Sequence, residues 1–217
     1  MKKSLYSLML MDSVVAEIDR LALRSNTNRS NLVNQILADY VSMMTPEKRI
    51  GSIFKYMESI MTGSGDLVPL VTPNHRTMSV KSSLEYKYRP TIRYEVQLFR
   101  APSGAIGELS VIFRTQSAQL IASINEFLRL WVRLENIYIS KLHEKQPVKY
   151  ELYDGRFVRS LSLPENRDYN DEQLGEAISG YVSMFDSLLK AFLNNTCTRE
   201  ELENRYLAYL NRGIGII

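Results

Sequence analysis

Cysteine, histidine and long apolar runs are scarce in this 217-residue chain, and each scarcity excludes a class of protein. Cys197 is the only cysteine, so an intrachain disulfide is impossible and a reducing compartment is the simplest interpretation. The most apolar helical stretch is interrupted by Asn125, Glu126, Arg129 and Arg133, and a transmembrane helix needs about 18 or more apolar residues. The first residues also lack the pattern of a secretory signal. We therefore expect a soluble, cytoplasmic protein that does not insert into a membrane.

The sequence also has little of the chemistry that catalysis requires. His75 and His143 are the only histidines, and neither has carboxylates beside it at metal-ligand spacing. There is no phosphate-binding glycine loop, nucleophile elbow or zinc-protease helix motif. Acidic residues such as Glu85 and Glu95 are more typical of cross-strand pairs. We expect no enzymatic activity, no cofactor and no metal.

Ordinary globular composition is what remains. Hydrophobic residues make up 45% of the chain and charged residues 24%, which is enough to form a sizeable core. The net charge of +3 permits an anionic partner without requiring one. Charge is unevenly distributed, since the middle of the chain is basic and its C-terminal part is acidic. The length favours two domains, a short N-terminal unit and a larger body.

Residues 4–10 alternate between two faces, which is typical of a β-strand. One face carries Tyr6, Leu8 and Leu10, and the other carries Leu5, Ser7 and Met9. The first face is apolar, so we expect its side chains to be buried. A lone short strand followed by two short helices cannot bury a core, so we expect the chain to pair with a second copy.

Two short amphipathic helices follow this segment. Asp12 or Ser13 is a candidate cap for the first, and Asn28 for the second. Between them Asn26 tolerates the left-handed backbone conformation. The apolar positions at helical spacing are Val14, Ile18, Leu21 and Ala22 in the first helix and Leu32, Val33, Ile36, Leu37 and Tyr40 in the second.

Together, residues 2–42 resemble the ribbon-helix-helix family of bacterial and phage repressors and plasmid copy-control proteins. In that family two chains pair their strands into an antiparallel ribbon that enters the DNA major groove. The N-terminus of the second helix grips a phosphate. The resemblance assigns groove-facing positions to Leu5, Ser7 and Met9, a phosphate clamp to Asn28, Arg29 and Ser30, and backbone contacts to Lys2 and Lys3.

One feature departs from the family pattern. Family members generally present polar side chains on the outward ribbon face, whereas Leu5 and Met9 cannot read a donor and acceptor code. Apolar contact with thymine methyl groups is one alternative. The other is that this face packs on the protein's own body or on another dimer, and that the unit serves only to pair chains.

The rest of the chain predicts alternating strands and long helices. We expect a helix from Thr45-Pro46 to about Met61, then a loop over 62–79. Alternating runs beginning at Leu84, Ile92 and Leu109 predict an antiparallel meander, and Asp154-Gly155 predicts a hairpin of strands 148–153 and 156–163. A helix over 116–143 with Thr115 as its cap, and helices opened by capping boxes at Asn170/Gln173 and Thr198/Glu201, complete the prediction.

These elements predict the α+β class, with a ribbon-helix-helix unit followed by a small antiparallel sheet and long helices. We divide the chain into residues 1–44 for dimerisation and DNA binding, 45–79 for a connecting helix and linker, and 80–217 for an α+β domain.

A second candidate surface lies on the expected meander, where cations and aromatics alternate. Its members are Lys87, Arg89, Arg93, Phe99, Arg100 and Arg114. A sheet that exposes aromatics among cations can bind single-stranded RNA or DNA. The same alternation, with Tyr86 and Tyr94 on the core face, also describes an ordinary amphipathic sheet.

Our leading hypothesis is therefore a homodimeric protein that binds double-stranded DNA, as a transcriptional regulator or an accessory factor of a plasmid or mobile element. The alternative is a scaffold or accessory protein. It would dimerise through the N-terminal unit and use the basic 80–163 region to bind single-stranded nucleic acid or a protein partner.

Overall fold

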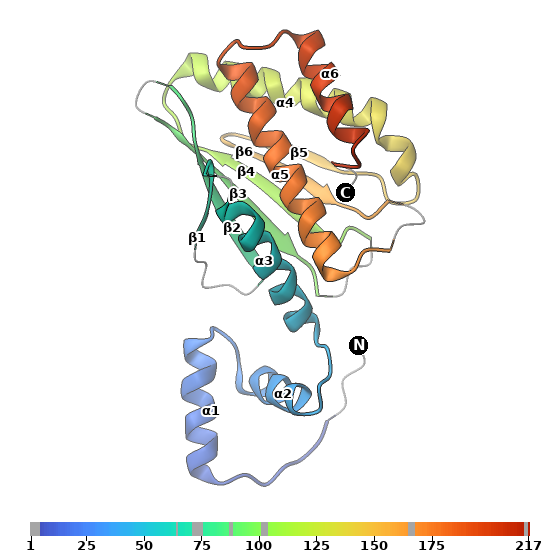
Figure 1. Ribbon diagram of the computed structural model, residues 1–217. Coiled ribbons are helices and arrows are strands. Elements are labelled where there is room, and N and C mark those ends of the chain that lie inside the picture. Colours follow the sequence, from blue (N-terminus) through green and yellow to red (C-terminus); the bar gives the residue numbers. More distant parts are fainter. Residues whose placement is uncertain are drawn as a thin grey trace.

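The computed structural model describes residues 5–63, 65–70, 76–86, 89–100, 104–164, 168–214 and 217. Within them the fold combines α-helices with one six-stranded antiparallel sheet, so the predicted α+β class is confirmed (Figure 1). The helices are α1 (Asp12–Arg24), α2 (Arg29–Tyr40), α3 (Pro46–Thr62), α4 (Ala118–Tyr138), the 3₁₀ helix η1 (Ser140–His143), α5 (Asp171–Leu193) and α6 (Arg199–Leu210). The strands are β1 (Leu67–Leu70), β2 (Thr77–Ser83), β3 (Thr91–Leu98), β4 (Gly107–Phe113), β5 (Tyr150–Tyr153) and β6 (Arg156–Leu161).

The sheet has the order β1-β2-β3-β4-β6-β5, with every neighbouring pair antiparallel. The hairpin between β5 and β6 is confirmed, and it turns through Gly155, whose φ of 69° suits a residue without a Cβ. Strands β1 and β5 form the two edges. Pro69 in β1 has no N–H to donate, which is tolerated at an edge.

The alternating residues of β3 lie on one face of the sheet, as predicted. Ile92, Tyr94 and Val96 are fully buried there, opposite Phe113, Val111 and Leu109 of β4. Helices α3, α4 and α5 cover this face, and α6 packs on α5 (Figure 1). Phe185 of α5 lies against the ring of Tyr94 at a centroid distance of 6.1 Å, so α5 forms the centre of the core.

Helix α3 packs closely against α5 and belongs to this core. Ile53 and Met57 of α3 are buried in the same cluster as the sheet residues. The contact depends on Gly175 of α5, because a Cβ there would lie 3.1 Å from the carbonyl oxygen of Ile53. The helix starts at Pro46 as predicted, and the Thr45 hydroxyl caps it by accepting a hydrogen bond from the Lys48 amide.

The N-terminal unit is the part of the fold that lies away from the sheet, with α1 and α2 beyond the first turn of α3 (Figure 1). Residues 5–10 are not a strand in the single chain, and Ser4 lies outside the described residues. The predicted strand is thus not seen, and residues 5–10 pair with no strand of the sheet. Tyr6 and Leu8, which we expected to be buried, are 82% and 62% exposed.

Four local predictions were wrong. Residues 62–79 are not a continuous loop, because Leu67–Leu70 and Thr77–Ser79 belong to strands. The first meander strand ends at Ser83, before the alternating run that starts at Leu84. Two helix caps also differ. Helix α4 is capped by Ser117 rather than Thr115, and Met11 precedes α1 with no side-chain cap. The division of the chain at residue 44 stays a prediction.

Candidate functional site

The turn between α1 and α2 has the predicted geometry. Asn26 has a φ of 47°, in the left-handed region that asparagine tolerates. The side chain of Asn28 accepts a hydrogen bond of 2.9 Å from the amide of Asn31, which caps α2. Both predictions are confirmed. The N-terminus of α2 is therefore a well-formed turn with the side chains of Asn28, Arg29 and Ser30 exposed.

An ion pair joins this turn to α1. The guanidinium of Arg29 donates two hydrogen bonds to Asp19, with distances of 2.7 Å and 2.5 Å. These hydrogen bonds lower the pKa of Asp19 and raise that of Arg29. Both side chains remain about half exposed. The guanidinium therefore lies at the N-terminus of α2 and is held in place by a carboxylate that an incoming anion would have to displace.

Apolar side chains are widely exposed over the same unit. Leu5 and Met9 are fully exposed, and Tyr40 is 90% exposed. Other large apolar side chains exposed here are Tyr6, Leu8, Leu10, Met11, Leu21, Leu23, Ile36, Leu37, Val41, Met43 and Met44. Only Ala22 and Ala38 of the described residues of α1 and α2 are buried. A single chain therefore leaves most apolar side chains of this unit in contact with solvent.

Two ion pairs lie where the N-terminal unit meets the body. Lys48 of α3 contacts Asp39 of α2 at 2.6 Å, and Arg100 contacts Glu47 of α3 at 2.8 Å. They border a hollow of about 300 Å³ whose lining also includes Asn26, Gln35 and Arg76. The cations and carboxylates around the hollow are mixed, so it has no strong preference for one sign of charge.

The cations of the second candidate surface do not form one cluster. The sheet face opposite to that covered by α3, α4 and α5 is called the helix-free face below. Arg93 and Arg114 are exposed at one end of this face, and Arg89 lies in the turn that precedes β3. Arg100 lies beyond the opposite end of β3, in its ion pair with Glu47. Phe99 is partly buried. Lys87, like Lys2 and Lys3, lies outside the described residues.

Two further cations lie near Arg93 and were not predicted from the sequence. Lys81 of β2 lies directly opposite Arg93, and Arg156 of β6 lies opposite Ile112, which is itself the partner of Arg93. Their alternation with buried neighbours would have placed each of them on the helix-free face. What the sequence did not reveal is the strand order that brings them into one row.

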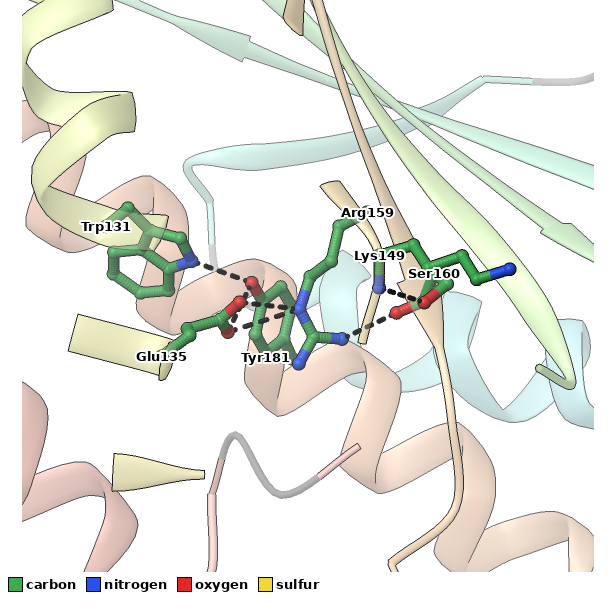
Figure 2. Close-up of polar contacts among 6 residues, drawn as sticks. All are labelled: Trp131, Glu135, Lys149, Arg159, Ser160 and Tyr181. Atoms are coloured by element: carbon green, nitrogen blue, oxygen red, sulfur yellow. Dashed lines mark hydrogen bonds and ion pairs between the residues drawn. The ribbon is translucent and has the colours of Figure 1, made fainter. Parts of the chain in front are cut away.

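A buried polar cluster in the body was not predicted either (Figure 2). The carboxylate of Glu135 on α4 accepts hydrogen bonds from Nε of Arg159 on β6, and from the hydroxyl of Tyr181 on α5 at 2.9 Å. The indole N–H of Trp131 donates to the same hydroxyl at 2.8 Å. The cluster thus connects two helices with the sheet.

Burial controls the protonation of this cluster. It raises the pKa of Tyr181 well above the usual tyrosine value, and the nearby Glu135 carboxylate acts in the same direction. Burial is the largest influence on Arg159 and opposes its charge, but Glu135, Tyr181 and Tyr150 together outweigh burial and raise the pKa of that guanidinium. Nη2 of Arg159 has no hydrogen-bond partner among the described residues. The cluster holds an ion pair in a dry environment, which fits a structural role.

No helix in the described part of the chain is long and apolar enough to cross a membrane. Among the same residues no group of three or more His, Cys, Asp or Glu side chains is arranged to hold a metal ion.

Comparisons with known proteins give no relatives: no family model, no curated protein and no solved structure matches this chain.

Proposed function

We propose that the protein is a dimeric DNA-binding protein whose N-terminal unit pairs with that of a second copy, as in the ribbon-helix-helix arrangement. The carrying observation is the exposure of apolar side chains over residues 5–44, which the single chain leaves uncovered. If residues 5–10 of two chains pair antiparallel, Tyr6 and Leu8 face the helices of the dimer and lose their contact with water. Burial of apolar surface then stabilises the pair.

DNA contact would use the turn that opens α2. A helix N-terminus presents unpaired amides and a positive dipole end to a phosphate. Arg29 is the first residue of α2, beside these amides, and Ser7 would lie on the outward face of the ribbon. Lys2 and Lys3 immediately precede this segment in the sequence, so they would meet the DNA backbone.

The outward side chains fit a limited form of base recognition. Leu5 and Met9 are fully exposed and apolar, so they suit contact with thymine methyl groups, while Ser7 is the polar contact. Such a protein would serve as a transcriptional regulator or as an accessory factor of a plasmid or mobile element. Selection of bound sequences from a random duplex pool would identify its site.

The test separates phosphate contact from base contact. The full-length protein is titrated with the selected duplex over a range of salt concentrations, with Arg29→Ala, Ser7→Ala and wild type compared. Arg29→Ala should weaken binding and reduce the salt slope by about one, because one phosphate contact is lost. Ser7→Ala should change sequence preference more than the salt slope.

Arg129→Ala is the matched control, because Arg129 is exposed on α4 in the body. It should leave both binding and salt slope unchanged. If neither N-terminal substitution weakens a specific complex, the DNA-binding role of this unit is wrong. Tyr6→Lys with Leu8→Lys tests the pairing itself and should abolish both the dimer formed through the N-terminal unit and the specific complex.

The alternative, single-stranded nucleic-acid binding by the 80–163 region, has weaker support. Arg93 is paired with Glu95 at 3.2 Å, and Arg100 with Glu47. Tyr94, the aromatic at the centre of β3, is fully buried and unable to stack on a base. A single-stranded pool in the same selection would detect this activity, and replacing Arg89, Arg93 and Arg100 together should then abolish it.

A further inference from the structure

The helix-free face of the sheet separates its charges by sign. One end carries the exposed cations Lys81, Arg93, Arg114 and Arg156, which we call the basic band. The other carries Glu95, Glu108 and Glu151, which we call the acidic band. Both sets face away from the helices, because their members within strands alternate with residues of the core face, and Arg114 directly follows the core-face residue Phe113 at the end of β4.

The register of the strands brings each band together. Lys81 lies opposite Arg93, Arg93 opposite Ile112, and Ile112 opposite Arg156, so three cations share one row across four strands. Two residues further along β3, Glu95 lies opposite Ser79 and Ser110, and the row continues through Val158 to Glu151. The two rows are therefore neighbours of opposite charge.

Opposing charges near each band do not reverse its sign. Asp154 precedes Arg156 in the hairpin turn, and Lys145 and Lys149 line a hollow that also includes Glu108 and Glu151. The ion pair between Arg93 and Glu95 joins the bands across their boundary. With Asp154 counted, the four cations of the basic band leave a net charge of +3. With Lys145 and Lys149 counted, the three acids of the acidic band leave a net charge of −1.

We propose that this face docks on the same face of a second copy of the chain. A two-fold axis that lies in the interface and runs along the rows, perpendicular to the strands, places the basic band of each copy over the acidic band of the other. Charge complementarity of this kind fixes register and suppresses other pairings. A nucleic acid lying on the basic band would instead meet the acidic band beside it, which repels phosphate.

The shape and composition of the face suit close approach. The small residues Ser79 and Ser110 lie at its centre and are buried between larger side chains, with Arg156 donating a hydrogen bond to the Ser110 hydroxyl. Apolar side chains are exposed on the same face, with Val68 at 52% and Tyr153 at 54%. Six strands about 4.8 Å apart and on average six residues long span roughly 600 Å², somewhat less than the roughly 800 Å² per partner of a standard interface.

This second interface is independent of the N-terminal pairing proposed above. The experiment therefore uses the full chain with Tyr6→Lys and Leu8→Lys, so that association through the N-terminal unit does not contribute. Sedimentation velocity at low salt should show that this chain is a dimer, and its dissociation should increase with salt because exposed charge pairs are screened.

Charge reversal then tests complementarity. Lys81→Glu with Arg93→Glu should weaken the dimer by more than about tenfold, because two acidic surfaces face each other. Glu95→Lys with Glu108→Lys should weaken the dimer to a similar extent, because two basic surfaces then face each other. A one-to-one mixture of the two reversed chains should restore a dimer, which damage to the fold of either chain could not do. Circular dichroism checks that each variant is folded.

Arg129→Glu with Arg133→Glu is the matched control, because both arginines are exposed on α4, outside the sheet. It should leave the dimer unchanged. The proposal is overturned if the starting chain is monomeric at every concentration or if the mixed reversed chains stay apart. It is also overturned if reversal of the basic band removes only nucleic-acid binding, which would assign the band to an anionic polymer.

Discussion

Glu135 and Arg159 form an ion pair that is completely excluded from solvent, with Nε of Arg159 2.9 Å and 3.1 Å from the two carboxylate oxygens. The guanidinium also lies over the ring of Tyr181, with its carbon 4.3 Å from the ring centroid. Nη1 donates to the carbonyl of Ser160 at 3.1 Å. The pair links α4 to β6 and fixes the distance between helix layer and sheet.

Removal of one partner should destabilise the fold severely. Glu135→Gln leaves the guanidinium buried without its counter-charge, and we expect a loss of about 3–5 kcal/mol in the free energy of unfolding. Glu135→Leu combined with Arg159→Met should cost less than Glu135→Gln alone, because no buried charge remains. Urea denaturation followed by circular dichroism measures each value.

The exposed pair between Arg199 and Glu126 supplies the control. Glu126→Gln should change the free energy of unfolding by less than about 1 kcal/mol, since exposed ion pairs contribute little. Equal losses for Glu135→Gln and Glu126→Gln would contradict the role of the buried pair.

Gly175 and Gly51 are both helical glycines, and alanine should have opposite effects at the two. At Gly175 a Cβ would lie 3.0 Å from Cδ1 of Tyr56 and 3.1 Å from the Ile53 carbonyl oxygen, so α3 and α5 must move apart. We expect Gly175→Ala to destabilise by about 1–3 kcal/mol. At Gly51 no atom lies within 4 Å, so Gly51→Ala should stabilise by about 0.5–1 kcal/mol through helix propensity. Thermal unfolding measures the change in stability for each variant. A stabilising effect of Gly175→Ala would disprove the close contact.

Local sequence signals predicted most of the helices and part of the sheet. The capping boxes of α5 and α6 and the Asp154-Gly155 hairpin formed as expected, because each depends on residues a few positions apart. Strand β1 was missed because four residues containing Pro69 have no clear alternation. Its place in the sheet comes from pairing with β2.

In the candidate site, only features formed by residues close together in the sequence could be predicted. The Asn28 cap and the left-handed Asn26 follow from residue type. The ion pair of Arg29 with Asp19, ten residues away, depends on how α1 and α2 fold back on each other. The Glu135–Arg159 pair and the basic band depend on strand order and helix docking, which no short segment encodes.

Tyr94 should make the stability of the fold sensitive to alkali. Burial and the Asp186 carboxylate, which accepts a hydrogen bond of 2.9 Å from its hydroxyl, raise the pKa of Tyr94 well above the usual value. An unfolded tyrosine titrates near pH 10, so the stabilisation is fully present below about pH 10 and is lost as the pH rises toward the folded pKa. Each such tyrosine should contribute a slope of about 1.4 kcal/mol per pH unit.

Urea denaturation between pH 8 and pH 11.5, about the range over which unfolded tyrosines ionise, measures this slope. Tyr94→Phe should be less stable at neutral pH, because Asp186 loses a hydrogen-bond donor, and its slope above pH 10 should be smaller by about 1.4 kcal/mol per pH unit. An unchanged slope for Tyr94→Phe would contradict the assignment.

Asp19 should oppose phosphate binding by Arg29 if the N-terminal unit contacts DNA as proposed. A phosphate at the N-terminus of α2 must compete with the Asp19 carboxylate for the guanidinium. Asp19→Asn removes the competing charge, so duplex binding should tighten by about two- to five-fold, the range of an exposed ion pair. Because the net charge of the unit also rises, Asp12→Asn is the matched control. Asp12 is an exposed acid of the same helix whose side chain is not hydrogen-bonded to Arg29.

If the competition is specific, Asp19→Asn increases duplex affinity more than Asp12→Asn does. This increase should disappear when Arg29→Ala is also present. Fluorescence anisotropy with a labelled duplex compares wild type, Asp19→Asn, Asp12→Asn, Arg29→Ala and the Asp19→Asn, Arg29→Ala double variant at one salt concentration, because salt alone changes affinity. If both single acid substitutions tighten binding equally, the gain is general electrostatics and Arg29 is not the phosphate ligand. If Asp19→Asn weakens binding, the ion pair instead holds Arg29 in its binding position, and the competition argument is wrong.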